Sequence, residues 1–195
     1  MKIRRFATCM IAFVLMSVCS LRALAQNGHS HPQTNQPTAE QKSQAAELLR
    51  IVRESTERFK DVAVAEKEGY HLLFGCVSGP DAGAMGLHYV NQSILGTNAI
   101  DVTRPQIVIY EPTGDGHLKL IGADYLVFAD GWDATHQDPP MLMGQIFHLF
   151  ETPNRFRLPA FYTLHVWAWK ENPNGAFVNW HPNVSCESFV GPTTP

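Results

Sequence analysis

Three residues in otherwise apolar segments of this sequence have side chains that could carry chemistry. His88 and His165 each lie in a short apolar run with strand character, and Asp124 lies between apolar neighbours in the run Leu118–Ala129. Two imidazoles and a carboxylate are a ligand set used by zinc, copper and non-haem iron sites. We therefore predict a transition-metal pocket formed by His88, Asp124 and His165, although their spacing matches no diagnostic metal motif.

The prediction rests on the cost of burying these groups without partners. An unpaired buried imidazole nitrogen costs about 1–3 kcal/mol, and an isolated buried carboxylate costs more. A shared metal would satisfy both histidines at once, with their ligating nitrogens roughly 3–4 Å apart. Separate backbone carbonyls would explain the two histidines equally well. Asp124 would either ligate the metal or orient one of the histidines.

The sequence lacks the motifs of several common enzyme classes, so we assign no reaction. It contains no phosphate-binding loop, no dinucleotide fingerprint, no G-x-S-x-G and no H-E-x-x-H. A second interpretation is a non-catalytic binding module with an aromatic pocket for a small ligand. Four tryptophans are candidates for the lining of that pocket: Trp132, Trp167, Trp169 and Trp180. A third interpretation is an exported structural protein without a ligand.

The first 25 residues have the pattern of a secretory signal peptide, with a positive start, an apolar run and the cleavage site Ala23-Leu24-Ala25. Its removal takes four of the 15 Lys and Arg residues and none of the 18 acids, which leaves a net charge of −7. A mildly acidic exported chain is a poor candidate for binding nucleic acid. No later stretch reaches the roughly 18 apolar residues of a membrane span. We expect a periplasmic or secreted protein whose partner is a metal ion or a small molecule; the sequence predicts no oligomeric state.

Two cysteines, Cys76 and Cys186, remain after the predicted signal peptide. A lone pair of cysteines in an oxidising compartment predicts one disulfide. The alternative is a thiolate that ligates a metal or acts as a nucleophile.

The elements that must position these residues predict an α+β fold. Residues 26–37 form a polar leader that we expect to be disordered. Apolar residues at helical spacing predict a helix over Thr38–Glu68, with a break near Ser55-Thr56 and a C-cap at Gly69. Strands are predicted at Tyr70–Val77, Leu87–Asn91, Gln106–Glu111, Leu118–Ala129 and Phe161–Lys170, with a loop over Gly79–Gly86. We therefore predict a single domain, residues 38–195, in which a long N-terminal helix packs on a curved antiparallel sheet or partly closed barrel.

The segment Pro112–Gly116 predicts a hairpin turn between two of these strands. In the predicted register, Glu111 pairs near Leu118 and Ile107 pairs near Gly122. The apolar face of the hairpin would then carry Asp124 together with Ile107, Ile109, Leu120 and Leu126. The prolines near His181 predict a solvated loop there.

Two segments in combination resemble a group of small, uncharacterised, exported bacterial proteins. They are GAMGLHYVN, residues 83–91, and LHVWAWKENPNGAF, residues 164–177. The similarity covers most of residues 61–186, and it supports export and the disulfide but implies no reaction. The group often carries His at the position of Phe161 and Asn at that of His181. If the first of these is a metal ligand in the group, its absence here weakens the metal hypothesis.

Overall fold

The fold is taken from a computed structural model, which describes residues 36–79 and 81–194. The predicted signal peptide and nearly all of the predicted leader lie outside this part of the chain. No helix within it is both long and apolar enough to cross a membrane.

The predicted N-terminal helix is present and breaks close to the predicted place. Thr38 and Gln41 form a capping box that begins α1 (Ala39–Thr56). A 3₁₀ turn, η1 (Glu57–Lys60), separates α1 from α2 (Val62–Lys67). The Asp61 side chain accepts a hydrogen bond from the Ala63 amide and so starts a second helix instead of extending the first. Gly69, with φ +92°, ends the helical segment as predicted.

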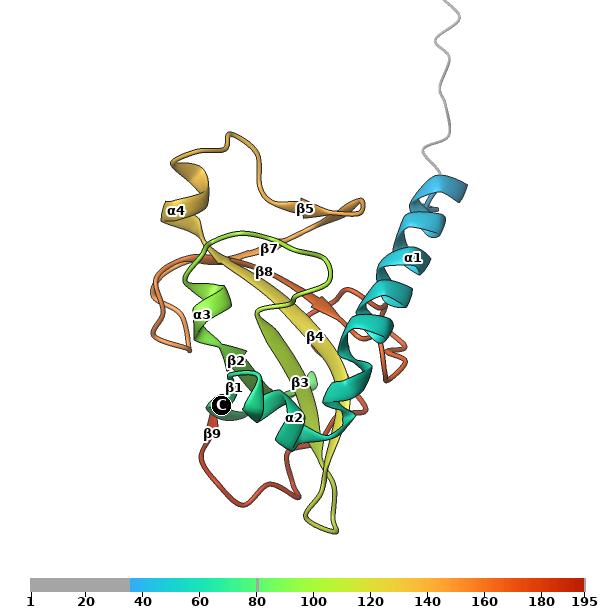
Figure 1. Ribbon diagram of the computed structural model, residues 1–195, viewed down its shortest axis with the longest axis vertical. Helices are drawn as coiled ribbons and strands as arrows, with labels where there is room; N and C mark the ends of the chain where they lie inside the picture. Colours follow the sequence, from blue (N-terminus) through green and yellow to red (C-terminus); the bar gives the residue numbers. More distant parts are fainter. Residues whose placement is uncertain (1–35, 80, 195) are drawn as a thin grey trace, which may run out of the picture. The chain divides into compact units, whose positions relative to one another are not determined.

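The remainder of the chain forms a curled, half-barrel antiparallel sheet (Figure 1). The strands run in the order β7-β8-β4-β3-β2-β1-β9, and only the short β9 is parallel to its neighbour. Their bounds are β1 (Tyr70–Gly79), β2 (Gly83–Asn91), β3 (Ile107–Pro112), β4 (Leu118–Phe128), β7 (His148–Phe150), β8 (Phe161–Val166) and β9 (Thr193–Thr194). A separate hairpin is formed by β5 (Met141–Leu142) and β6 (Gln145–Ile146), and two short helices are α3 (Gln92–Leu95) and α4 (Ala129–Asp133). The α+β class predicted from the sequence is confirmed.

The two faces of the sheet have different coverings. The N-terminal helical segment packs on one face, where Leu48 and Val52 of α1 join Tyr125 and Leu164 in one cluster. Farther along the same face, Phe59 of η1 joins a cluster with Val108, Tyr110 and Leu120. The opposite face holds Ile107, Ile109, Leu126 and Phe161. This second face, which carries no long helix, also holds the predicted site residues.

The predicted hairpin exists, but the predicted pairing of its strands is wrong at the end far from the turn. Glu111 pairs with Lys119, whereas Ile107 pairs with Asp124 and not with Gly122. The shift at Ile107 is two residues. One comes from the turn, because Pro112 pairs with Leu118, and one comes from a bulge, because Ile121 is an extra residue on β4 between the partners of Ile109 and Tyr110. Beyond the bulge Asp124 stays on the predicted face with Ile107. Leu120 moves to the helix-covered face, so its predicted placement is wrong.

The loop predicted over Gly79–Gly86 is also wrong, because Gly83–Gly86 belongs to β2. The glycine at position 86 allows two strands to approach each other closely and does not form a turn. Gly86 has φ +88°, and a Cβ on it would lie 2.6 Å from the carbonyl oxygen of Tyr110. Only glycine therefore lets β2 lie this close to β3.

The predicted disulfide between Cys76 and Cys186 is present, with a Cα–Cα distance of 5.8 Å. It ties the irregular C-terminal segment to β1. Replacing both cysteines by alanine should lower the free energy of unfolding by about 4–5 kcal/mol, because the unfolded chain gains the entropy of a loop of 110 residues. Urea unfolding of the oxidised protein and the double variant measures this. A reduced wild-type protein should match the variant, and an unchanged unfolding midpoint would contradict the assigned role.

Three buried tyrosines connect the sheet to distant backbone carbonyls. Tyr70 donates to Pro105 O (2.8 Å), Tyr110 to Phe59 O (2.7 Å) and Tyr125 to Val102 O (2.6 Å). Burial raises the pKa of Tyr70 to about 12 and raises the pKa of the other two phenols still further.

We therefore expect a loss of stability in alkali that depends on these tyrosines. Their pKa values are higher in the folded than in the unfolded chain, so the stabilisation is complete below about pH 10 and declines above it. The urea midpoint should fall from about pH 10 upward, and the phenolate absorbance of the three should appear only with unfolding. Tyr110→Phe should make the pH dependence shallower; an unchanged dependence would show that other groups cause it.

Candidate metal centre

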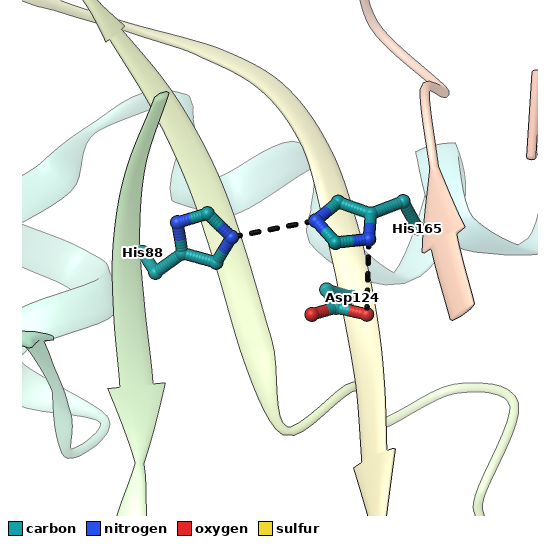
Figure 2. Close-up of side chains that lie close together, drawn as sticks. All are labelled: His88, Asp124 and His165. Carbon is teal, nitrogen blue, oxygen red and sulfur yellow. Dashed lines mark hydrogen bonds and ion pairs between the residues drawn. The ribbon is translucent and has the colours of Figure 1, made fainter. Parts of the chain in front are cut away.

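His88, Asp124 and His165 meet on the face of the sheet that lies opposite the long helix. They come from β2, β4 and β8, where Asp124 and His165 form a direct pair. His88 is three strand positions away from His165, about 14 Å on a flat sheet. The curl of the sheet instead brings the two Nε2 atoms to 3.4 Å (Figure 2). The predicted approach of the histidines is confirmed, whereas metal binding stays a prediction.

All three side chains are withdrawn from water. His88, Asp124 and His165 are 5%, 2% and 2% exposed, and one ligand atom from each lies within 4.8 Å of the other two. Burial lowers the pKa of His88 to about 4 and that of His165 to about 3. Both imidazoles are therefore neutral near pH 7, which is the form that ligates metals.

The surroundings fix which nitrogen of His88 carries the hydrogen. Its Nδ1 lies 3.2 Å from the carbonyl oxygen of Gly86, which can only accept. The hydrogen therefore sits on Nδ1, and the lone pair of Nε2 points at His165. A backbone carbonyl on the outer nitrogen is the usual support of a histidine that ligates a metal.

His165 has the same orientation for a different reason. Its Nδ1 faces Oδ1 of Asp124 at 3.7 Å, and the side chain of Asn179 also raises the pKa of the ring. Among the described residues this nitrogen has no hydrogen-bond partner, so its contact with Asp124 is long. A carboxylate oxygen accepts a hydrogen, which places the hydrogen on Nδ1. The two Nε2 lone pairs then face each other, and the group of three residues could hold a metal ion.

Asp124 is a buried carboxylate with no basic side chain to neutralise it. The Thr163 hydroxyl donates to its Oδ1 at 2.5 Å, and the Leu164 amide also contributes a hydrogen bond. Within the described part of the chain, its single ion-pair contact is with the neutral ring of His165. Burial raises the pKa of Asp124 to about 6. The site therefore holds one uncompensated negative charge near pH 7.

The three residues open onto a small apolar cavity of about 30 Å³. Phenylalanines supply much of its wall: Phe74, Phe150, Phe156 and Phe161. None of the four tryptophans lines this cavity, whereas Trp167 and Trp169 line a separate open hollow beside Arg53 and Glu171. Trp167 instead stacks beside His165 with ring centroids 5.8 Å apart, and Trp132 stacks on His136 at the surface. Phe161, the position noted in the resemblance, lies in the cavity wall.

Two irregular backbone segments bring aromatic rings into the cavity. Phe74 adopts φ +69° in a bulge of β1 between the residues that pair with His88 and Leu87. Such a conformation costs a bulky residue about 1–3 kcal/mol. Phe156 lies on a loop held by the Asn154 side chain, which bonds to the backbone of Glu151, Phe156 and Leu158. Nothing in the sequence predicts the bulge at Phe74. The loop that carries Phe156 lies between two prolines, Pro153 and Pro159, and its composition does not indicate an ordered segment.

His181 does not lie in the predicted solvated loop. Its side chain is fully buried, and its backbone forms a bridge with Ala84 of β2. The ring packs edge-on to Trp167 with centroids 5.0 Å apart, and its Nδ1 accepts a hydrogen bond from the Asn183 amide. The disulfide at Cys186 anchors this segment, in which His181 and Val184 are buried whereas Pro182 and Asn183 are exposed. His181 is not part of the group formed by His88, Asp124 and His165.

Comparison of the chain with protein-family models, with curated proteins and with solved structures found no match. The chemistry of the site must therefore be argued from its own residues.

Thr163 supports the site through Asp124, and this can be tested without metal. Thr163→Val removes the hydroxyl donor to a buried carboxylate and should lower the free energy of unfolding by about 1–3 kcal/mol. Thr163→Ser keeps the donor and should lose less. Urea unfolding of the three metal-free proteins measures the effect. Equal stability of wild type and the valine variant would mean that the hydroxyl contributes nothing.

Proposed function

We propose that the protein binds a single transition-metal ion between His88 and His165, with Asp124 as a third ligand or as the group that orients His165. The observation that carries the proposal is the distance of 3.4 Å between the two Nε2 atoms. Two imidazoles bound to one tetrahedral ion at about 2.0–2.1 Å have nitrogens about 3.3–3.4 Å apart. A linear two-ligand ion would need about 4.0–4.2 Å.

A direct hydrogen bond between the rings is a weaker explanation of the same distance. An N–H···N contact of 3.4 Å is long compared with the usual value of about 3.0 Å. It would also require one ring to carry its hydrogen on Nε2 instead of Nδ1. Either Gly86 O or Asp124 would then lose the hydrogen that its histidine neighbour offers. A metal ion leaves both outer hydrogens in place.

The charge of the site supports the same proposal. Two neutral imidazoles and one carboxylate carry a net charge of −1 inside an apolar wall. A bound cation would offset that charge and so lower the cost of burying Asp124. Zinc, copper and iron all accept imidazole and carboxylate ligands.

The phenylalanine-walled cavity supports one other function, a binding module for a small apolar ligand without metal. The two functions separate cleanly, because apolar binding would survive the loss of both histidines. The disulfide, together with the signal-peptide pattern, supports a place of action in the periplasm or outside the cell.

The metal proposal predicts what purified, untagged protein contains. We expect close to one equivalent of a transition metal in the wild type, and loss of nearly all of it in His88→Ala and His165→Ala. Asp124→Asn should weaken metal binding by about 10–100-fold even if the carboxylate acts only through His165. Elemental analysis by mass spectrometry, followed by titration of the metal-free proteins, measures both effects.

His136→Ala is the matched control, because His136 lies at the surface against Trp132. Its metal content should equal that of the wild type. Metal-free wild-type protein that cannot be loaded, or equal loading of the His88 and His136 variants, would overturn the proposal.

A further inference from the structure

An irregularity in β2 places Met85 in the wall of the cavity that the three site residues also line. Val77 pairs with Gly86 and Ser78 pairs with Ala84, so Met85 is an extra residue opposite β1. In a regular strand a residue three positions from His88 would point to the opposite face. The bulge cancels this alternation, and Met85 lines the same cavity as the three site residues.

The thioether of Met85 is the one uncommitted donor in the described side chains of the cavity wall. Met85 is 1% exposed, and the remaining wall outside the site residues consists of aliphatic and phenyl groups apart from Thr163. The Thr163 hydroxyl is already bonded to Asp124.

The number of protein ligands points to a further donor. An ion bridging Nε2 atoms 3.4 Å apart is bent and not linear. A bent ion with two imidazoles needs at least one more donor, and Met85 and Asp124 both line the same cavity. Thioether sulfur is a soft ligand that selects copper(I) over zinc or iron(II).

The charge balance of the cavity favours the same metal. Asp124 is the one acidic side chain in the described wall of the cavity, and a carboxylate that ligates a metal is deprotonated. A monovalent ion neutralises it completely, whereas a divalent ion leaves a net positive charge among phenylalanine rings. Burying such an unbalanced charge is costly.

We propose that the metal centre is a copper(I) site in which Sδ of Met85 is a ligand beside His88 and His165. This inference rests on the proposed function, and it adds the identity of the metal and a ligand of a different class. It includes no redox step, only the binding of an ion supplied in its reduced form.

The test compares two identical substitutions, Met85→Leu in the cavity and Met141→Leu at an exposed position of β5. Metal-free proteins are titrated anaerobically with copper(I) in competition with a chromogenic copper(I) chelator, and separately with zinc(II). Met85→Leu should weaken copper(I) binding about tenfold or more while zinc(II) affinity changes less than about twofold. Met141→Leu should alter neither affinity.

X-ray absorption gives a reading that does not depend on the variant folding. The copper edge of the loaded wild type should show one sulfur neighbour at about 2.3 Å, and the selenium edge of selenomethionine-labelled protein should show a copper neighbour. Absence of sulfur and selenium neighbours, or equal copper(I) affinity of Met85→Leu and wild type, would overturn the inference.

The outcomes also separate this inference from the proposed function. If the wild type binds copper or zinc without a sulfur neighbour, and His88→Ala does not bind it, the proposed metal site is supported and the role of Met85 is not. Failure of the wild type to bind either metal would overturn both.

Discussion

The rest of this fold depends on one close approach, that of two imidazole nitrogens across a curled sheet. His88 and His165 stand on strands that are not neighbours, yet their Nε2 atoms are 3.4 Å apart. The approach needs tight curvature between β2 and β8, and the backbone supplies it through bulges and through glycines where strands come closest. A Cβ on Gly122 of β4, for example, would lie 2.6 Å from Val166 O of β8. The long helix stabilises the opposite face and leaves the concave face free for the site.

Extra residues in the strands decide which side chains reach the site. The extra residue Ile121 in β4 turns Leu120 toward the helix while Asp124 keeps its place beside His165. The extra residue Met85 brings sulfur to the cavity, and the bulge at Phe74 brings a phenyl ring. A regular sheet with the same sequence would scatter these groups over both faces. The helix-covered face, with tyrosines bonded to distant carbonyls, holds the backbone in this shape.

The sequence was sufficient for features that depend on local pattern or on simple pairing. The helix with its break, the α+β class, the lone cysteine pair and the interior placement of Asp124 all follow from periodicity, capping and composition. The bulges could not be predicted, because an extra residue is tolerated only where a particular neighbouring strand accepts it. Gly83–Gly86 therefore resembled a loop. His181 resembled a solvated residue because its burial depends on a disulfide and a bridge to Ala84, both distant in sequence. The cost of burying the two histidines was enough to predict that they approach each other. The sequence did not indicate that phenylalanines, and not tryptophans, line the cavity beside them.

The separation of the two histidines along the chain also bears on how the protein matures. They are 77 residues apart, and strands β3 and β4 must be in place before the rings can meet. Bringing together such distant residues costs loop-closure entropy, and the packing of the two faces of the sheet offsets that cost when the domain folds. A metal that binds the folded protein and not the unfolded chain would add stability in proportion to the logarithm of its free concentration. If the proposed site binds an ion in this way, the metal content of the protein would report the free concentration of that ion around it.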